Sequence, residues 1–169
     1  QVPWEGGQAL RGDQDPWPTV SASEIAFDTD WHVPQALDDD GMDRVTDAFV
    51  HAARRAVRLG FEVVELHSAH GYLLHQFLSP LSNQRDDAYG GTLADRMRFP
   101  LQVLEAVRAV VPSSVALGMR ISATDWVDGG WDVDDSIEYV GAAQSVGIDY
   151  VCVSTAGLTE DMQLVVRVA

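Results

Sequence analysis

Residues 61–72 of this chain read FEVVELHSAHGY, a mostly apolar run followed by two histidines and a tyrosine. The segment from Phe61 to His67 is short and mostly apolar, which predicts a β-strand. His67 and His70 fall where this strand gives way to a loop, and Tyr72 follows two residues later. An apolar strand that ends in hydrogen-bonding side chains is typical of a sheet that carries a functional site at its edge.

Helices and strands alternate along the chain around this stretch. Apolar residues at helical spacing predict a helix over residues 41–59, which Gly60 ends. The same patterns predict two further helices and two further strands, at residues 92–111, 115–122, 134–146 and 148–154. This regular order, helix then strand, predicts parallel β/α units.

A polar residue lies at or near the carboxyl end of each expected strand: His67, Arg120 with Ser122, and Ser154. A (β/α)8 barrel and a doubly wound sheet both build their active sites at that edge. No Gly-x-Gly-x-x-Gly follows any of the strands, which argues against a Rossmann dinucleotide site. The pattern alone leaves the barrel and the doubly wound sheet open.

Residues 1–40 are rich in Gly, Pro, Asp and Trp and show no sustained period. We interpret them as an irregular excursion with a short hairpin that covers a larger body. Residues 68–91 are expected to form a loop with a short helical piece at 72–77. Thr92 can cap the next helix, and Pro100 inside that helix predicts a kink or a restart.

Acidic residues outnumber basic ones by 26 to 11, so the formal net charge is −15, and every basic residue is an arginine. Such a surface repels polyanions, and we expect neither nucleic-acid nor membrane partners. The first residues lack the basic start and apolar core of a signal peptide. Cys152 is the single cysteine, which excludes an internal disulfide and is compatible with a cytoplasmic location. The sequence is compatible with a homo-oligomer.

The two histidines and the tyrosine suit one particular chemistry. A neutral imidazole can donate a hydrogen bond to a carbonyl oxygen that gains negative charge during a reaction. The phenol of Tyr72 can act as a proton donor. Two such donors and an acid suit the addition of hydride to a conjugated carbonyl compound, whose α-carbon then needs a proton.

Two other interpretations of the histidine pair stay open on these grounds. His-x-x-His can bind a metal ion, but no third ligand is suitably placed, since His75 lies in an apolar, helix-like stretch. The pair can also be structural, with both side chains making hydrogen bonds to backbone groups at the end of the strand. We expect no metal site.

Arg120 stands in the middle of an otherwise apolar strand, where a charge is costly to bury without an anion or strong acceptors. One interpretation is an ion pair with Glu65 on the neighbouring strand. The other is a cation beside a bound electron-rich ring or anion. Both stay open on the sequence pattern.

A longer stretch resembles a known family. The run from His67 to Asn83, HSAHGYLLHQFLSPLSN, strongly resembles the Old Yellow Enzyme family. A histidine at position 70, where many members carry Asn, is similar to the bacterial thermophilic-like branch. Residues 120–123 resemble the family's flavin-contacting strand, and residues 149–154 its next strand. Further positions also fit the family's pattern: Arg85, Asp87, Tyr89, Gly90, Gly91, Arg96, Arg98 and Phe99.

The resemblance implies a (β/α)8 TIM barrel that holds FMN without a covalent bond. Residues 41–169 would then form about three of its central β/α units. Bound FMN would take hydride from NADPH or NADH and pass it to a small activated alkene. The alkene would be the C=C bond of an α,β-unsaturated carbonyl compound.

The resemblance also assigns roles residue by residue. His67 and His70 look like the pair that binds the substrate carbonyl or the nicotinamide amide, with Ser68 and Ala69 between them in the substrate site. Tyr72 is similar to the tyrosine that protonates the α-carbon. Finally, Arg120 resembles the arginine beside the flavin, which stabilises the anionic reduced ring.

Three strands are recognisable, whereas a barrel has eight and typically needs about 250 residues. We therefore expect an internal fragment that by itself neither holds FMN nor turns over, because strand edges would stay unpaired. Other functions remain under consideration: a dienoyl-CoA reductase or amine dehydrogenase relative, a metal-dependent TIM-barrel hydrolase using the histidine pair, and an inactive truncated paralogue.

Overall fold

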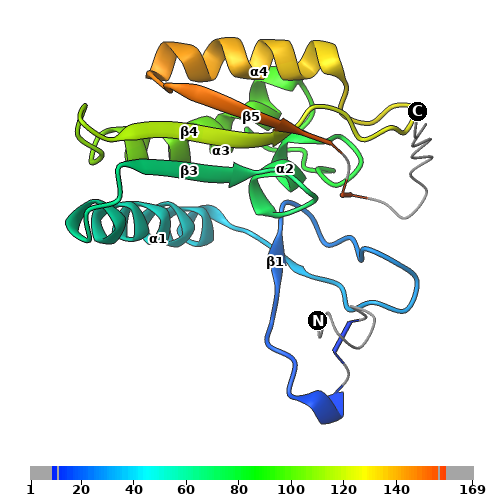
Figure 1. The fold of residues 1–169 in the computed structure, drawn as a ribbon. Helices are drawn as coiled ribbons and strands as arrows, with labels where there is room; N and C mark the ends of the chain where they lie inside the picture. The colour runs from blue at the N-terminus through cyan, green and yellow to red at the C-terminus, as the bar shows by residue number, and fades with distance from the viewer. Residues whose placement is uncertain (1–8, 11, 156, 159–169) are drawn as a thin grey trace, which may run out of the picture.

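The computed structural model describes residues 9–10, 12–155 and 157–158 of the 169-residue chain. Figure 1 shows a sheet with helices packed against it and an extended N-terminal excursion beside it. The remaining positions, which include both ends of the chain, lie outside the described residues. The limits expected for the regions 1–40 and 41–169 are therefore not tested. The elements are η2 (Gly12–Gln14), β1 (Val20–Ser21), β2 (Gln35–Ala36), α1 (Asp39–Arg58), β3 (Val63–Ser68), α2 (Leu73–Leu78), α3 (Leu93–Arg108), β4 (Ala116–Ser122), α4 (Val133–Val146) and β5 (Tyr150–Ser154).

The three longer strands form one parallel sheet in the order β3-β4-β5. Their register places His67 opposite Arg120, and Arg120 opposite Cys152. α3 packs between α1 and α4, and it lies behind β4 in Figure 1. Parallel strands joined through helices are β/α units, so the order of elements expected from the sequence is confirmed.

Side chains on these strands alternate between two faces, as the strand period of two requires. On β4, Leu117, Met119 and Ile121 are buried in the hydrophobic core that the sheet shares with its helices. On the opposite face of β3, Val63 and His67 are exposed. We call this second face the open face; the predicted site residues His67 and Arg120 lie on it. Among the described residues, no helix is both long and apolar enough to cross a bilayer.

Side-chain caps explain where the helices begin. The predicted N-cap at Thr92 is confirmed, since its hydroxyl accepts a hydrogen bond from the N–H of Asp95. Asp38 and Asp132 cap α1 and α4 in the same way, each satisfying an N–H that would otherwise lack a partner. The sequence therefore sets the start of each β/α helix locally.

The restart expected at Pro100 is not found, because α3 runs as one helix from Leu93 to Arg108. A proline within a helix removes one backbone hydrogen bond. Here Phe99, Val103 and Leu104 are buried around it, and their packing keeps the helix continuous.

The N-terminal excursion is built differently from the expected hairpin. β1 and β2 pair in parallel, with Val20 opposite Gln35, whereas a hairpin needs antiparallel strands. The expectation of a hairpin is therefore wrong for these residues, because the connection over residues 22–34 is long enough to carry the chain back. Arg85 ties the excursion to the body, since its Nη1 donates to the carbonyl oxygens of Ala22 (2.9 Å) and Leu37 (2.8 Å).

Replacing Arg85 by alanine should lower the free energy of unfolding by about 1–3 kcal/mol, because two carbonyl oxygens lose a charged donor. Chemical denaturation of the full-length protein measures this change. The matched control is Arg54→Ala, on the exposed side of α1, which we expect to change stability by less than about 0.5 kcal/mol. Equal effects of the two substitutions would contradict the anchoring role of Arg85.

Candidate active site

The carboxyl ends of β3, β4 and β5 meet at one edge of the sheet, which is where the predicted site residues gather. The ring centroids of His67 and His70 are 5.1 Å apart, and those of His67 and Tyr72 are 5.3 Å apart. Tyr72 is 60% exposed. The structure thus brings together the three residues singled out from the sequence, and it leaves their rings accessible to a ligand on the open face.

His70 is held by serines from two other strands. Its backbone N–H donates to Ser122 Oγ (2.9 Å), and its Nε2 lies 2.6 Å from Ser154 Oγ. The two serines were noticeable in the sequence as polar strand ends, but their shared partner was not, because His70 is distant from both along the chain. His70 also has a backbone φ of 59°, a value that residues other than glycine rarely adopt. The hydrogen bonds therefore stabilise an unusual backbone.

Gly71 continues this left-handed turn, with a φ of 72°. A Cβ at this position would overlap the carbonyl oxygen of Gly157, and a Cβ on Gly157 would overlap the backbone of His70. The loop after β3 and the chain after β5 thus approach backbone to backbone, which only glycines allow. This close approach fixes the distance between the histidine loop and the end of β5.

Ser68 and Ala69 are placed away from the open face. Ser68 is 1% exposed and its hydroxyl lies 3.2 Å from that of Tyr139 on α4, while Ala69 is fully buried. Burial raises the pKa of Tyr139 to about 12, so its phenol stays protonated at neutral pH. The side chains of Ser68 and Ala69 do not reach the open face, so their placement gives no support to the substrate-binding role predicted for them.

Arg120 forms the ion pair considered from the sequence, with its Nε 2.9 Å from Glu65 Oε1. The hydrogen bond to Glu65 raises the pKa of the guanidinium, which stays charged. In the part of the chain that the structure describes, its side chain is 40% exposed on the open face, so the burial expected from the sequence is not found there. Ion pairing with Glu65 and contact with a ligand are therefore compatible, since a ligand on this face would meet a cation that is already oriented.

The pKa of His67 lies below its ordinary value of 6.5, first because of partial burial and then because of the nearby charges of His70 and Arg120. We expect an NMR titration of the full-length protein to give a His67 midpoint below 6.5. Replacing His70 by asparagine should move that midpoint upward, because one source of repulsion is removed. A wild-type midpoint at or above 6.5 would contradict this account.

The lowered pKa of His67 makes the free energy of unfolding depend on pH. The folded pKa lies below the unfolded one, so the folded protein binds fewer protons between the two values. The contribution of His67 to stability is therefore complete above pH 6.5, and it is lost as the pH falls through the pKa of His67 in the folded protein. At neutral pH the ring is uncharged and has one N–H to donate.

The sequence did not reveal a buried network beneath the histidine loop. His75 is fully buried, with Nδ1 accepting from the N–H of Gly71 (3.0 Å) and Nε2 3.1 Å from Asp125 Oδ1. These two residues are far apart in sequence, and no periodic pattern links them. Among the described residues, no three side chains of His, Cys, Asp or Glu gather as metal ligands.

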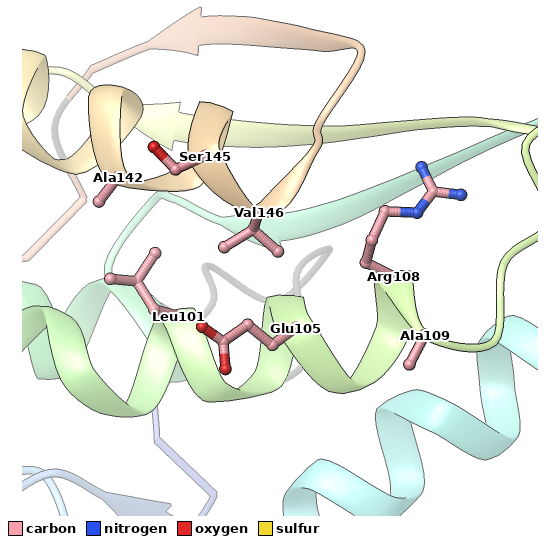
Figure 2. A pocket seen from close by; sticks show the side chains of 7 residues that line it. All are labelled: Leu101, Glu105, Arg108, Ala109, Ala142, Ser145 and Val146. Atoms are coloured by element: carbon pink, nitrogen blue, oxygen red, sulfur yellow. The ribbon is translucent and has the colours of Figure 1, made fainter.

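A separate groove of about 590 Å³ lies between α3 and α4. Figure 2 shows side chains of both helices around it, with Leu101 and Glu105 on α3 and Val146 on α4. The histidine loop contributes none of its lining residues, and a groove between neighbouring helices is ordinary packing. The groove is therefore separate from the histidine cluster on the open face of the sheet.

Parallel β/α units with site residues at the carboxyl ends of their strands occur in TIM barrels and in doubly wound sheets, and comparison with known families separates the two. The profile of the NADH:flavin oxidoreductase / NADH oxidase family matches residues 3–165, and the chain belongs to this family. Its members use FMN with NAD(P)H as the reductant. The predicted partial (β/α)8 barrel of the Old Yellow Enzyme type is thereby confirmed.

Individual relatives agree with this assignment. An NADPH dehydrogenase of Clostridium acetobutylicum is 42% identical over 140 residues, which are 82% of this chain and 41% of the relative. An NADH:flavin oxidoreductase of Gibberella zeae is 38% identical over 155 residues, which are 84% of this chain and 38% of the relative. The chain thus spans about two fifths of the length of the curated relatives it matches.

Two solved structures show the same arrangement of elements. A 2-naphthoyl-CoA reductase in complex with 2-naphthoyl-CoA aligns with a TM-score of 0.78 at 26% identity, over 82% of this chain and 21% of that one. Morphinone reductase aligns with a TM-score of 0.71 at 29% identity, over 82% of this chain and 42% of that one.

The position of Arg120 suits contact with a flavin ring. Its guanidinium lies on the open face, and His67 is its direct neighbour across the β3–β4 pair. Neighbouring strands are about 4.8 Å apart, so a planar ring over this position could meet the cation and the histidine loop at once. A fixed cation suits a ring that becomes negatively charged on reduction.

Proposed function

We propose that the protein to which this chain belongs reduces the C=C bond of α,β-unsaturated carbonyl compounds with NADPH or NADH, through bound FMN. The observation that carries the proposal is the cluster of His67, His70 and Tyr72 on the open face, one strand away from Arg120. Two hydrogen-bond donors, an acid and a cation are the groups that conjugate reduction needs.

Each residue has one task in this proposal. Neutral His67 and His70 donate hydrogen bonds to the carbonyl oxygen, on which negative charge accumulates. For His70 the atom that meets the substrate is Nδ1, since Nε2 is engaged by Ser154. Tyr72 then gives its hydroxyl proton to the α-carbon, and Arg120 favours the anionic form of the reduced ring. Bound FMN supplies the hydride that reaches the β-carbon.

A second candidate stays within the flavoenzymes. The similarity to 2-naphthoyl-CoA reductase favours a reductase of conjugated acyl-CoA compounds. Such a substrate also presents a carbonyl oxygen to the histidine pair, so the open face suits both. The two candidates differ in the part of the substrate that is remote from the double bond, which other parts of the protein would bind.

Substrate profiling under anaerobic conditions tests the proposal. The full-length protein should consume cyclohexenone or maleimide with NADPH at a rate well above that with an enoyl-CoA or an amine. Preference for the acyl-CoA would favour the second candidate. Bound flavin without consumption of any alkene would overturn both and favour an inactive paralogue, and stoichiometric zinc without flavin would favour a hydrolase.

We also predict that residues 1–169 expressed alone retain no FMN. β3 and β5 each have a strand edge that nothing among the described residues pairs, and Val153 is 68% exposed on the helix-facing side of β5. Three of the eight strands of a barrel do not close the face over which the flavin would lie. Absorbance of the purified segment between 350 and 500 nm, where flavins absorb, is the measurement, and a stoichiometric yellow protein would refute the prediction. The proposal includes a cytoplasmic location, where NAD(P)H is available.

A further inference from the structure

We propose that the buried pair of His75 and Asp125 is a positioning device that holds the loop of His70 in its substrate-binding shape. It does so by keeping the proton of His75 on Nε2, which leaves Nδ1 as the acceptor for the N–H of Gly71. This inference rests on the proposed function only in that His70 binds a carbonyl. The arrangement of protons can be tested without any substrate.

The hydrogen bonds fix the tautomer of His75. Gly71 N–H donates to Nδ1 at 3.0 Å, so Nδ1 must carry the lone pair. The ring proton of the neutral imidazole is then on Nε2, which lies 3.1 Å from Asp125 Oδ1. That contact is close in distance, although the N–H is not well aligned with the oxygen. Neither atom has another partner within the described residues. The carboxylate therefore faces the proton that sets the tautomer.

Asp125 is kept ionised despite its burial. Burial alone would raise the pKa of its carboxyl group, but the close contact with His75 and the hydrogen bonds from Ser79 and the Trp131 backbone bring it below the ordinary value. Ser79 Oγ and Trp131 N–H both donate to Oδ2, at 2.6 and 2.8 Å. A buried carboxylate is costly and is kept only where donors surround it. Oδ1 is the atom left for His75.

The loop that contains His70 and Gly71 depends on His75 Nδ1 as a hydrogen-bond acceptor. His70 and Gly71 are consecutive residues in the left-handed region, with φ values of 59° and 72°. The N–H of the first is bound by Ser122 and the N–H of the second by His75. If Gly71 loses its acceptor, one of the two bonds that compensate the strained turn is gone, and His70 is free to shift away from the open face.

Replacing Asp125 by asparagine tests the pair directly. The two donors at Oδ2 require an acceptor, so the new amide must place its oxygen there and its nitrogen against His75 Nε2. Nε2 then has to accept, the ring proton moves to Nδ1, and this proton faces the N–H of Gly71. Two donors cannot share that position, so the loop must move although side-chain volume is unchanged.

The full-length protein should show three results. In the wild type, ¹⁵N NMR of labelled histidine should find Nδ1 of His75 unprotonated and Nε2 protonated, and Asp125→Asn should reverse this assignment. The same substitution should raise the KM for cyclohexenone by about tenfold, the equivalent of one hydrogen bond. The flavin content should stay as in the wild type. The matched control is Asp132→Asn, since asparagine caps a helix as well as aspartate does and this residue is exposed.

A second pair of variants keeps the test decisive if Asp125→Asn does not fold. His75→Asn retains an oxygen near the position of Nδ1, whereas His75→Leu fills the space without an acceptor. We expect the KM of the first to stay closer to the wild type than that of the second. A structural packing role alone predicts the opposite order. Protonated Nδ1 in wild-type His75 would overturn the inference, and this result does not depend on whether the protein reduces cyclohexenone. With a protein that reduces cyclohexenone, an unchanged KM in Asp125→Asn would overturn it as well.

Discussion

Alanine in place of His70 is expected to lower the rate of alkene reduction by about 10²–10³-fold, the usual loss when one donor to a developing oxyanion is removed. His70 is anchored by Ser122 and Ser154, so its ring is already oriented before a substrate arrives. Stopped-flow mixing of the dithionite-reduced full-length protein with cyclohexenone isolates this step. The use of dithionite matters, because the same histidines would hold the nicotinamide amide.

His70→Asn is the matched variant for this experiment. An asparagine amide also has an N–H to donate, so we expect most of the rate to survive, with a loss of less than about tenfold. The two variants remove the same imidazole and differ in the donor that remains. Equal rates for His70→Ala and the wild type would show that His70 does not bind the carbonyl.

Phenylalanine in place of Tyr72 is expected to slow the same step by about 10²–10⁴-fold, the usual contribution of a positioned general acid. Its ring lies over the edge of the site, 5.3 Å from the ring of His67, and is 60% exposed to an incoming ligand. Flavin reduction by NADPH needs no proton from this residue and should keep its rate. The loss should therefore be confined to the oxidation of the reduced flavin by the alkene.

Tyr89→Phe provides the control for this prediction. Tyr89 lies in the loop beside Arg85, which is 6.0 Å from its ring centroid, and its hydroxyl has no role in the proposed chemistry. The substitution removes the same atom without touching the histidine cluster. A rate for Tyr72→Phe equal to that of Tyr89→Phe would mean that the proton comes from elsewhere, such as solvent.

The sequence allowed most of the fold to be predicted because the signals are local. The cap at Thr92, the stop at Gly60 and the apolar run before His67 each act over a few residues. Prediction failed where contacts over a distance decide. The restart expected at Pro100 is absent because its buried neighbours keep α3 continuous, and β1 pairs with β2 in parallel because the segment between them carries the chain back.

The candidate site divides in the same way. His67, His70 and Tyr72 are close in sequence and follow one strand, so their grouping was predictable. The partnership of His75 with Asp125 was not, because the two are brought together only by the fold. Arg120 shows an intermediate case: Glu65 was foreseen as its partner, but the exposure of the pair on the open face depends on which side of the sheet the helices cover.

The most direct measurement of the central claim is a crystal structure of the full-length protein with FMN and cyclohexanone, the saturated product of cyclohexenone. We predict that the ketone oxygen lies within about 3.2 Å of a ring nitrogen of both His67 and His70. Tyr72 should lie beside the α-carbon, and Arg120 should contact the flavin. A ketone bound elsewhere, or a metal ion between the two histidines, would contradict the account.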